Sequence, residues 1–151
     1  IKDANSQEVD PKSKNLVIHL MEEQKKLLKE GKFGGTIRLG AWPCKIAKGT
    51  LLESLYSKYG NELFKSLPTV MERHRHRYEF NNEYKHMIEG KGMKLCGKSP
   101  NGRLIEAVEL DSKIHPFFLA TQYHPELKSR FIAPHPIFLG FIQACIKEGK
   151  K

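Results

Sequence analysis

Residues 121–126 read Thr121-Gln122-Tyr123-His124-Pro125-Glu126, and the apolar residues 117–120 lead into them. Aromatic, apolar and β-branched residues in succession favour a β-strand over residues 117–123. Proline has no N–H group and a fixed φ, so Pro125 ends this strand where the polar side chains begin. Because residues i and i+2 of an extended segment point the same way, we expect His124 and Glu126 to share a face at the end of the strand.

A histidine beside a carboxylate is a candidate catalytic pair. The carboxylate holds the imidazole in one tautomer and stabilises the imidazolium that forms when the ring takes up a proton. Open α/β sheets place their binding crevices at the carboxyl ends of their strands, which is where His124 and Glu126 are predicted to lie. The alternative is a surface histidine and glutamate at an ordinary strand exit.

The composition is that of a single folded domain. The chain has 151 residues, of which 39% are hydrophobic, enough for a core and too many for a disordered chain. No apolar run approaches the roughly 18 residues of a membrane-spanning helix, so we expect no membrane contact. The cysteines Cys44, Cys96 and Cys145 fit neither a disulfide framework nor a zinc pattern, which favours a reducing, cytoplasmic location.

Arginine alternates with histidine and aromatic residues over residues 70–80. In an extended strand Arg73, Arg75 and Arg77 face one way, and the residues between them face the other. A row of like charges repels itself, so we expect an anion to meet these arginines: a carboxylate substrate, a phosphate or acidic side chains. With the net charge of +9, the run also allows a basic nucleic-acid-binding module, although no recognised nucleic-acid motif accompanies it.

The histidines in the same run, His74 and His76, are spaced as two metal ligands could be. No third cysteine or carboxylate ligand is evident close to them in the sequence, so we predict no metal site.

Other patterns predict an α/β domain that is incomplete at its N-terminal side. A helix is expected over residues 51–59 and another over 137–146, the second with Phe138, Phe141, Ile142 and Cys145 facing inward. Residues 93–98 and 104–110 form a predicted hairpin, whose Glu106 and Glu109 should face solvent or pair with a cation. Further expected elements are a helix over residues 83–89, a strand flanked by Gly34, Gly35 and Gly40, and a possible helical excursion over residues 21–30.

Taken together, the motifs resemble a known family. The run at residues 122–126 is similar to class I glutamine amidotransferases, and the Arg-His-Arg-His-Arg-Tyr-Glu run at 73–79 is particular to the glutaminase domain of CTP synthases. The resemblance covers roughly residues 4–146, and it also includes Gly34–Gly40 and Pro136–Phe141. It implies a three-layer, flavodoxin-like α/β fold in which a cysteine attacks the side-chain amide of glutamine.

The resemblance also implies roles for individual residues. His124 would be the general base and acid, and Glu126 would orient it. Glu8, in Asn5-Ser6-Gln7-Glu8, is similar to the family residue that binds the amino end of glutamine. Arg77, which precedes Tyr78, is similar to the one that fixes the bound substrate, and the glutamine α-carboxylate would be the anion that it meets. No cofactor is expected in this chain.

One family feature has no match. The nucleophile of the family lies in a Gly-x-Cys-x-Gly turn between a strand and a helix, and none of the three cysteines has that context. The first residues, Ile1–Ser6, also lack a Met. We therefore expect residues 1–151 to be the C-terminal portion of the glutaminase domain, starting just downstream of the nucleophile and inactive alone. A glutaminase-like scaffold without catalysis is the remaining alternative.

The resemblance finally implies partners outside this chain. The ammonia released from glutamine would pass to a synthase domain of the same protein, which uses ATP and Mg²⁺ to aminate UTP to CTP. The complete protein is expected to be a homo-oligomer.

Overall fold

Two β-sheets organise the chain in the computed structural model, which describes residues 1–21, 24–25, 29, 37–60 and 68–150. The smaller sheet has the strand order β1-β2-β5. Its strands are β1 (Ala4–Ser6), β2 (Asn15–Leu20) and β5 (Tyr78–Phe80). β1 and β2 run parallel, whereas β2 and β5 are antiparallel with Leu20 opposite Tyr78.

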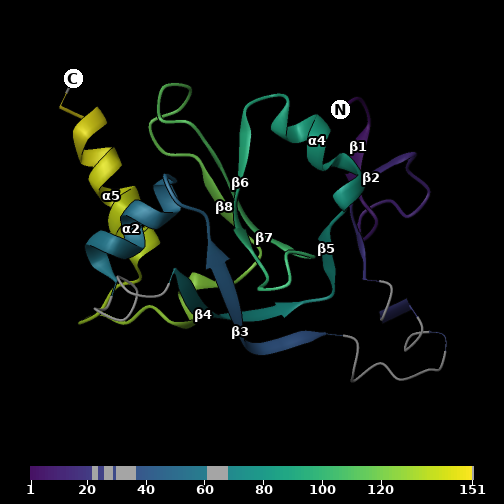
Figure 1. Cartoon of the computed structure of the whole chain (residues 1–151), viewed down its shortest axis with the longest axis horizontal. Helices are drawn as coiled ribbons and strands as arrows, with labels where there is room; N and C mark the ends of the chain where they lie inside the picture. Colours follow the sequence, from purple (N-terminus) through teal and green to yellow (C-terminus); the bar gives the residue numbers. More distant parts are fainter. Residues whose placement is uncertain (22–23, 26–28, 30–36, 61–67, 151) are drawn as a thin grey trace.

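The larger sheet is five-stranded and antiparallel, in the order β4-β3-β6-β7-β8. Its strands are β3 (Arg38–Ile46), β4 (Thr69–His76), β6 (Met93–Lys98), β7 (Ile105–Leu110) and β8 (Leu119–Thr121). β4 and β5 are separated by Arg77 alone, so the chain passes from one sheet to the other at this residue. In Figure 1 the small sheet lies to the right of the large one.

Two helices pack together against one face of the large sheet. They are α2 (Leu51–Tyr59) and α5 (Pro136–Glu148), which lie side by side at the left of Figure 1. The buried core joins them to the sheet through residues such as Leu52 of α2, Ile137 of α5 and Cys44 of β3. Between β5 and β6 lie a short 3₁₀-helix (Asn82–Tyr84) and α4 (Lys85–Glu89), close to the predicted helix 83–89.

The start of α2 is as predicted, with one addition from a distant strand. Thr50 caps the helix by accepting a hydrogen bond from the Glu53 backbone N–H at 3.1 Å. The carboxylate of Glu109 also accepts bonds from the N–H groups of Leu51 (2.8 Å) and Leu52 (3.0 Å). Our prediction for Glu109 was therefore wrong, because this buried carboxylate satisfies orphan donors at the positive end of the helix. Glu106 does pair with a cation, Arg38, at 2.6 Å.

The prediction for the inner face of α5 was wrong. Phe138, Phe141 and Ile142 are 37–53% exposed and Cys145 is exposed, whereas Ile137 and Gly140 are buried. A Cβ atom at Gly140 would lie 2.2 Å from Cδ2 of Leu55 on α2. The two helices thus meet where α5 has no side chain, and this close approach turns the larger residues of α5 away from the core.

The hairpin of β6 and β7 is confirmed, and its turn contains Gly102 at a positive φ of 72°. The strand predicted over 117–123 is shorter, because only Leu119–Thr121 pairs with β7. Gly40 has the special geometry expected of it, a φ of 92°, but lies within β3. The other predicted glycines, Gly34 and Gly35, and much of the possible helix 21–30 lie outside the described residues. No helix in the described part is long and apolar enough to cross a membrane.

Candidate active site

His124 and Glu126 are in direct contact. The Nδ1 atom of His124 lies 2.6 Å from Oε1 of Glu126, and their side chains are 34% and 56% exposed. The contact was expected from an extended segment, but the backbone turns instead: residues 125–127 form a 3₁₀-helix that begins with Pro125. This turn brings Glu126 back to the histidine ring. Because Nδ1 faces the carboxylate, the other ring nitrogen, Nε2, is left to exchange a proton.

Backbone and side-chain contacts hold this segment against the β4–β5 junction. The backbone N–H of His124 donates to the Arg73 carbonyl at 2.8 Å. Two residues earlier, the Gln122 amide donates to the Tyr78 carbonyl at 3.0 Å. The segment is therefore attached on both sides of Arg77. Gln122 is a positioning contact that our sequence argument did not assign.

Arg77 is partly buried and has an unused donor. Its Nε atom is shielded from solvent and has no hydrogen-bond partner within the described residues. A buried donor of this kind is costly unless a partner is supplied, and an anionic ligand is one way to supply it. The structure places this donor at the strand junction to which the His124 segment is attached.

Glu8 lies at the same end of the small sheet as Arg77. Gln7 donates its backbone N–H to Ile18 at 2.8 Å, and its side chain accepts from the N–H of Leu20 at 2.9 Å. Leu20 in turn is opposite Tyr78, the residue after Arg77. Glu8 itself is exposed. The structure thus brings Glu8, Arg77 and the His124 segment to one region, although their roles toward glutamine remain predictions.

The electrostatics of the pair favour a charged Glu126. Partial desolvation is the largest single influence and raises the pKa of this carboxyl group. The hydrogen bond from His124, a backbone hydrogen bond and the attraction to His124 and Arg75 together outweigh it, so the net pKa is lowered. Glu126 is therefore an acceptor that stays ionised at neutral pH, as an orienting carboxylate must be.

Behind the pair, the buried Glu72 joins four elements. Its Oε1 atom accepts a hydrogen bond from Tyr56 of α2 at 2.9 Å and lies 3.4 Å from His135, the N-cap of α5. Lys128, which follows the 3₁₀-helix of residues 125–127, reaches the same oxygen at 3.1 Å and also bonds to the Met71 carbonyl. Glu72 lies two residues before His74, on the inward side of the alternation, which is the only sequence signal for its burial.

The histidines His74 and His76 are close to a carboxylate after all. Suitable ligand atoms of His74, His76 and Glu106 lie within 4.8 Å of one another, so the sequence was misleading about a third ligand. Some of these atoms are already engaged: the two rings share a hydrogen bond of 2.9 Å between Nδ1 of His74 and Nε2 of His76, and Oε1 of Glu106 is paired with Arg38. Oε2 of Glu106 has no hydrogen-bond partner within the described residues. The nearby guanidinium opposes a second cation, and our prediction that the chain has no metal site stays a prediction.

None of the cysteines has the features of an activated nucleophile. Burial raises the pKa of Cys44 to about 12 and also raises the pKa of Cys96, which disfavours the reactive thiolate in both. Cys145 is exposed and lies within the helix α5, not in a turn between a strand and a helix.

Comparisons with known proteins identify the family. The family model described as glutamine amidotransferase class-I matches residues 15–144. CTP synthases of Carboxydothermus hydrogenoformans and Caldanaerobacter subterraneus are 48% and 49% identical over 99% and 97% of this chain. The chain spans about a quarter of the length of these curated relatives, 25% of each.

A solved structure extends the similarity to the fold. The Trypanosoma brucei CTPS glutaminase domain with bound acivicin has a TM-score of 0.78 and 33% sequence identity. The match covers 97% of this chain and 52% of that one. The α/β fold is thus that of a glutaminase domain, and the expected resemblance is confirmed. This chain belongs to the class I glutamine amidotransferase family, in the branch represented by CTP synthases.

Proposed function

We propose that this chain is the part of a CTP synthase glutaminase domain that supplies the general base and the substrate-binding side chains for glutamine hydrolysis. The observation that carries the proposal is the 2.6 Å contact between His124 and Glu126, fixed to the strand junction that contains Arg77. The membership in the amidotransferase family and the similarity to CTP synthases support it.

The geometry fits a base–orienter pair. Glu126 accepts a hydrogen bond from Nδ1–H of His124, which leaves the lone pair of Nε2 to take the proton of a cysteine thiol. The thiolate sulfur then bonds to the amide carbon of glutamine. The protonated ring returns the proton to the leaving nitrogen, which departs as ammonia. In the second half of the reaction, His124 activates the water that hydrolyses the thioester.

Arg77 and Glu8 would hold the ends of the substrate. The guanidinium of Arg77 can bind the α-carboxylate through charge-assisted hydrogen bonds, using the Nε donor that is unpaired in the described structure. Glu8 would face the α-ammonium group. The nucleophilic cysteine would come from another part of the same cytoplasmic protein. There the ammonia would be used, together with ATP and Mg²⁺, to convert UTP to CTP in a synthase domain.

The test is a comparison of two nitrogen sources in the complete CTP synthase. His124→Ala should abolish CTP formation from glutamine and leave CTP formation from ammonia unchanged, because only the first needs a general base at His124. The matched control is His86→Ala, since His86 is an exposed histidine of α4. Loss of both activities, or retention of both, would contradict the proposed role.

A second measurement concerns residues 1–151 alone. Incubated with glutamine, they should release no ammonia above the uncatalysed background, because none of their cysteines lies in a Gly-x-Cys-x-Gly turn and burial disfavours the thiolates of Cys44 and Cys96. Ammonia release by this chain would mean that a nucleophile lies within it.

A further inference from the structure

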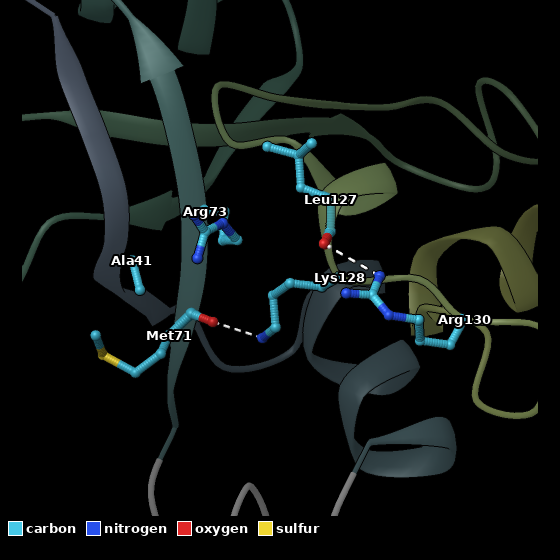
Figure 2. Close-up of a pocket in the computed structure, with 6 residues that line it drawn as sticks. All are labelled: Ala41, Met71, Arg73, Leu127, Lys128 and Arg130. Carbon is cyan, nitrogen blue, oxygen red and sulfur yellow. Dashed lines mark hydrogen bonds between the residues drawn. The ribbon is translucent and has the colours of Figure 1, made fainter.

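A basic pocket lies between β4 and residues 127–130, at the end of the 3₁₀-helix. Figure 2 shows its lining, which comes from β3, from β4, from the last residue of the 3₁₀-helix and from residues that follow it. Its volume is about 390 Å³, within the range of small-molecule sites. The lining consists of Ala41, Met71, Arg73, Leu127, Lys128 and Arg130. It includes neither His124 and Glu126 nor the predicted glutamine ligands Glu8 and Arg77.

The charges of this lining do not balance. Arg73, Lys128 and Arg130 contribute three cations, and no carboxylate is among the lining residues. Lys128 is directed to the Met71 carbonyl and to Glu72, which is buried behind the strand. Arg130 uses its Nη1 atom to donate to the carbonyls of Leu127 and Ser129. Its Nε and Nη2 donors make no hydrogen bond within the described residues.

Arg73 is the least satisfied of the three. Its side chain makes no hydrogen bond or ion pair with any other described residue, and it projects from the exposed side of β4. Figure 2 shows the cationic groups of Arg73, Lys128 and Arg130 arranged around one hollow. Holding like charges together costs free energy unless an anion neutralises them, which is the condition that the arginine run already implied.

We propose that this pocket binds a small oxyanion, through phosphate or carboxylate groups. A guanidinium presents paired donors whose spacing matches two oxygens of either group, and Lys128 adds a point charge. Met71 and Leu127 add apolar surface to the lining beside these cations. The binding chemistry depends on these residues alone and does not rest on the proposed glutaminase activity.

The experiment is calorimetric titration of the protein with pyrophosphate and, separately, with citrate, each at one fixed ionic strength set by chloride. We expect saturable binding of one anion per chain. Arg73→Gln should weaken it about tenfold or more, since a hydrogen bond to a charged group is among the stronger polar contacts. Arg130→Gln should also weaken it. A difference between the two probes then tells whether phosphate or carboxylate is preferred.

The control variant is Lys48→Gln, which removes one positive charge from an exposed loop residue outside the pocket. It should leave the affinity for both probes unchanged. Equal weakening by Lys48→Gln and Arg73→Gln would show attraction to the overall charge and overturn the proposal. The absence of saturable binding of either probe would overturn it too. Arg73 is exposed, so circular dichroism should show a folded Arg73→Gln variant.

Discussion

At the scale of single residues, the His124–Glu126 contact depends on a turn more than on strand periodicity. The alternation rule predicted that the two side chains would share a face, and they do touch, but the 3₁₀-helix at Pro125 provides the geometry. Proline at the first helical position is favourable in such a turn, because its fixed φ suits the helix and its missing N–H would be unpaired anyway. Pairing partners that are close in sequence are therefore predictable even when the backbone between them is misjudged.

The depressed pKa of Glu126 gives a prediction for this chain by itself. Since the hydrogen bond from His124 is the main lowering influence, His124→Ala should raise the pKa of the Glu126 carboxyl group, and Arg75→Gln should raise it less. The contact therefore stabilises the fold at pH values above the pKa that Glu126 has in the unfolded chain. This stabilisation is lost as the pH falls through the lower pKa of Glu126 in the folded chain. Carbon-13 NMR titration of the Glu126 carboxyl group measures the shift. An unchanged pKa in His124→Ala would refute the explanation.

At the scale of elements, features that depend on neighbouring residues could be predicted from the sequence, whereas contacts between distant segments could not. The bounds of α2 followed from Thr50 and Gly60, because capping is decided by neighbouring residues. The second cap of α2, Glu109, comes from a strand 57–58 residues away, and no local pattern reveals such a partner. The inner face of α5 was misjudged for the same reason, since its direction is set by Leu55 packing on Gly140.

Tyr56 offers a test of how α2 and α5 are joined to β4. Its hydroxyl donates to the buried Glu72, so Tyr56→Phe leaves a buried carboxylate short of one charged hydrogen bond. We expect the free energy of unfolding to fall by about 1.5–3 kcal/mol. The control is Tyr59→Phe on the same helix, whose ring lies beside Lys58 and which should change stability by less than about 0.5 kcal/mol. Urea unfolding compares them, and equal effects would rule out a special role for the Glu72 bond.

At the scale of the whole molecule, the buried His74 and the partly buried His76 lie where the two sheets meet. His76 Nδ1 bonds to the Tyr78 carbonyl of β5 at 2.9 Å, and its other ring nitrogen bonds to His74 of β4. Arg38, Glu106 and His124 are the charged or titratable groups that act on this pair. The alternation predicted that both histidines face away from the arginines. The sheet junction beside them also depends on the pairing of β5 with β2, which is distant in sequence.

These two histidines should make the fold sensitive to mild acid. Burial lowers the pKa of His74 to about 3 and that of His76 to about 4, so between about pH 6.5 and 4 the unfolded chain binds protons that the folded chain does not. Stability should then fall with decreasing pH by up to about 1.4 kcal/mol per pH unit for each histidine. Glu106, whose pKa is raised by burial, acts in the opposite direction above its ordinary pKa. Urea unfolding at several pH values between 7.5 and 5 measures the net slope.

A variant isolates the histidine contribution from that of Glu106. His74→Asn keeps a donor toward His76 but cannot take up the ring proton. The stability of this variant should therefore depend less steeply on pH than that of the unmodified protein, by up to about 1.4 kcal/mol per pH unit. His86→Asn is the control, because the His86 side chain is 93% exposed and protonation there costs little in either state. The prediction concerns the slope and holds even if His74→Asn lowers stability at every pH. Identical slopes for the unmodified protein and His74→Asn would show that His74 is protonated as easily when folded as when unfolded.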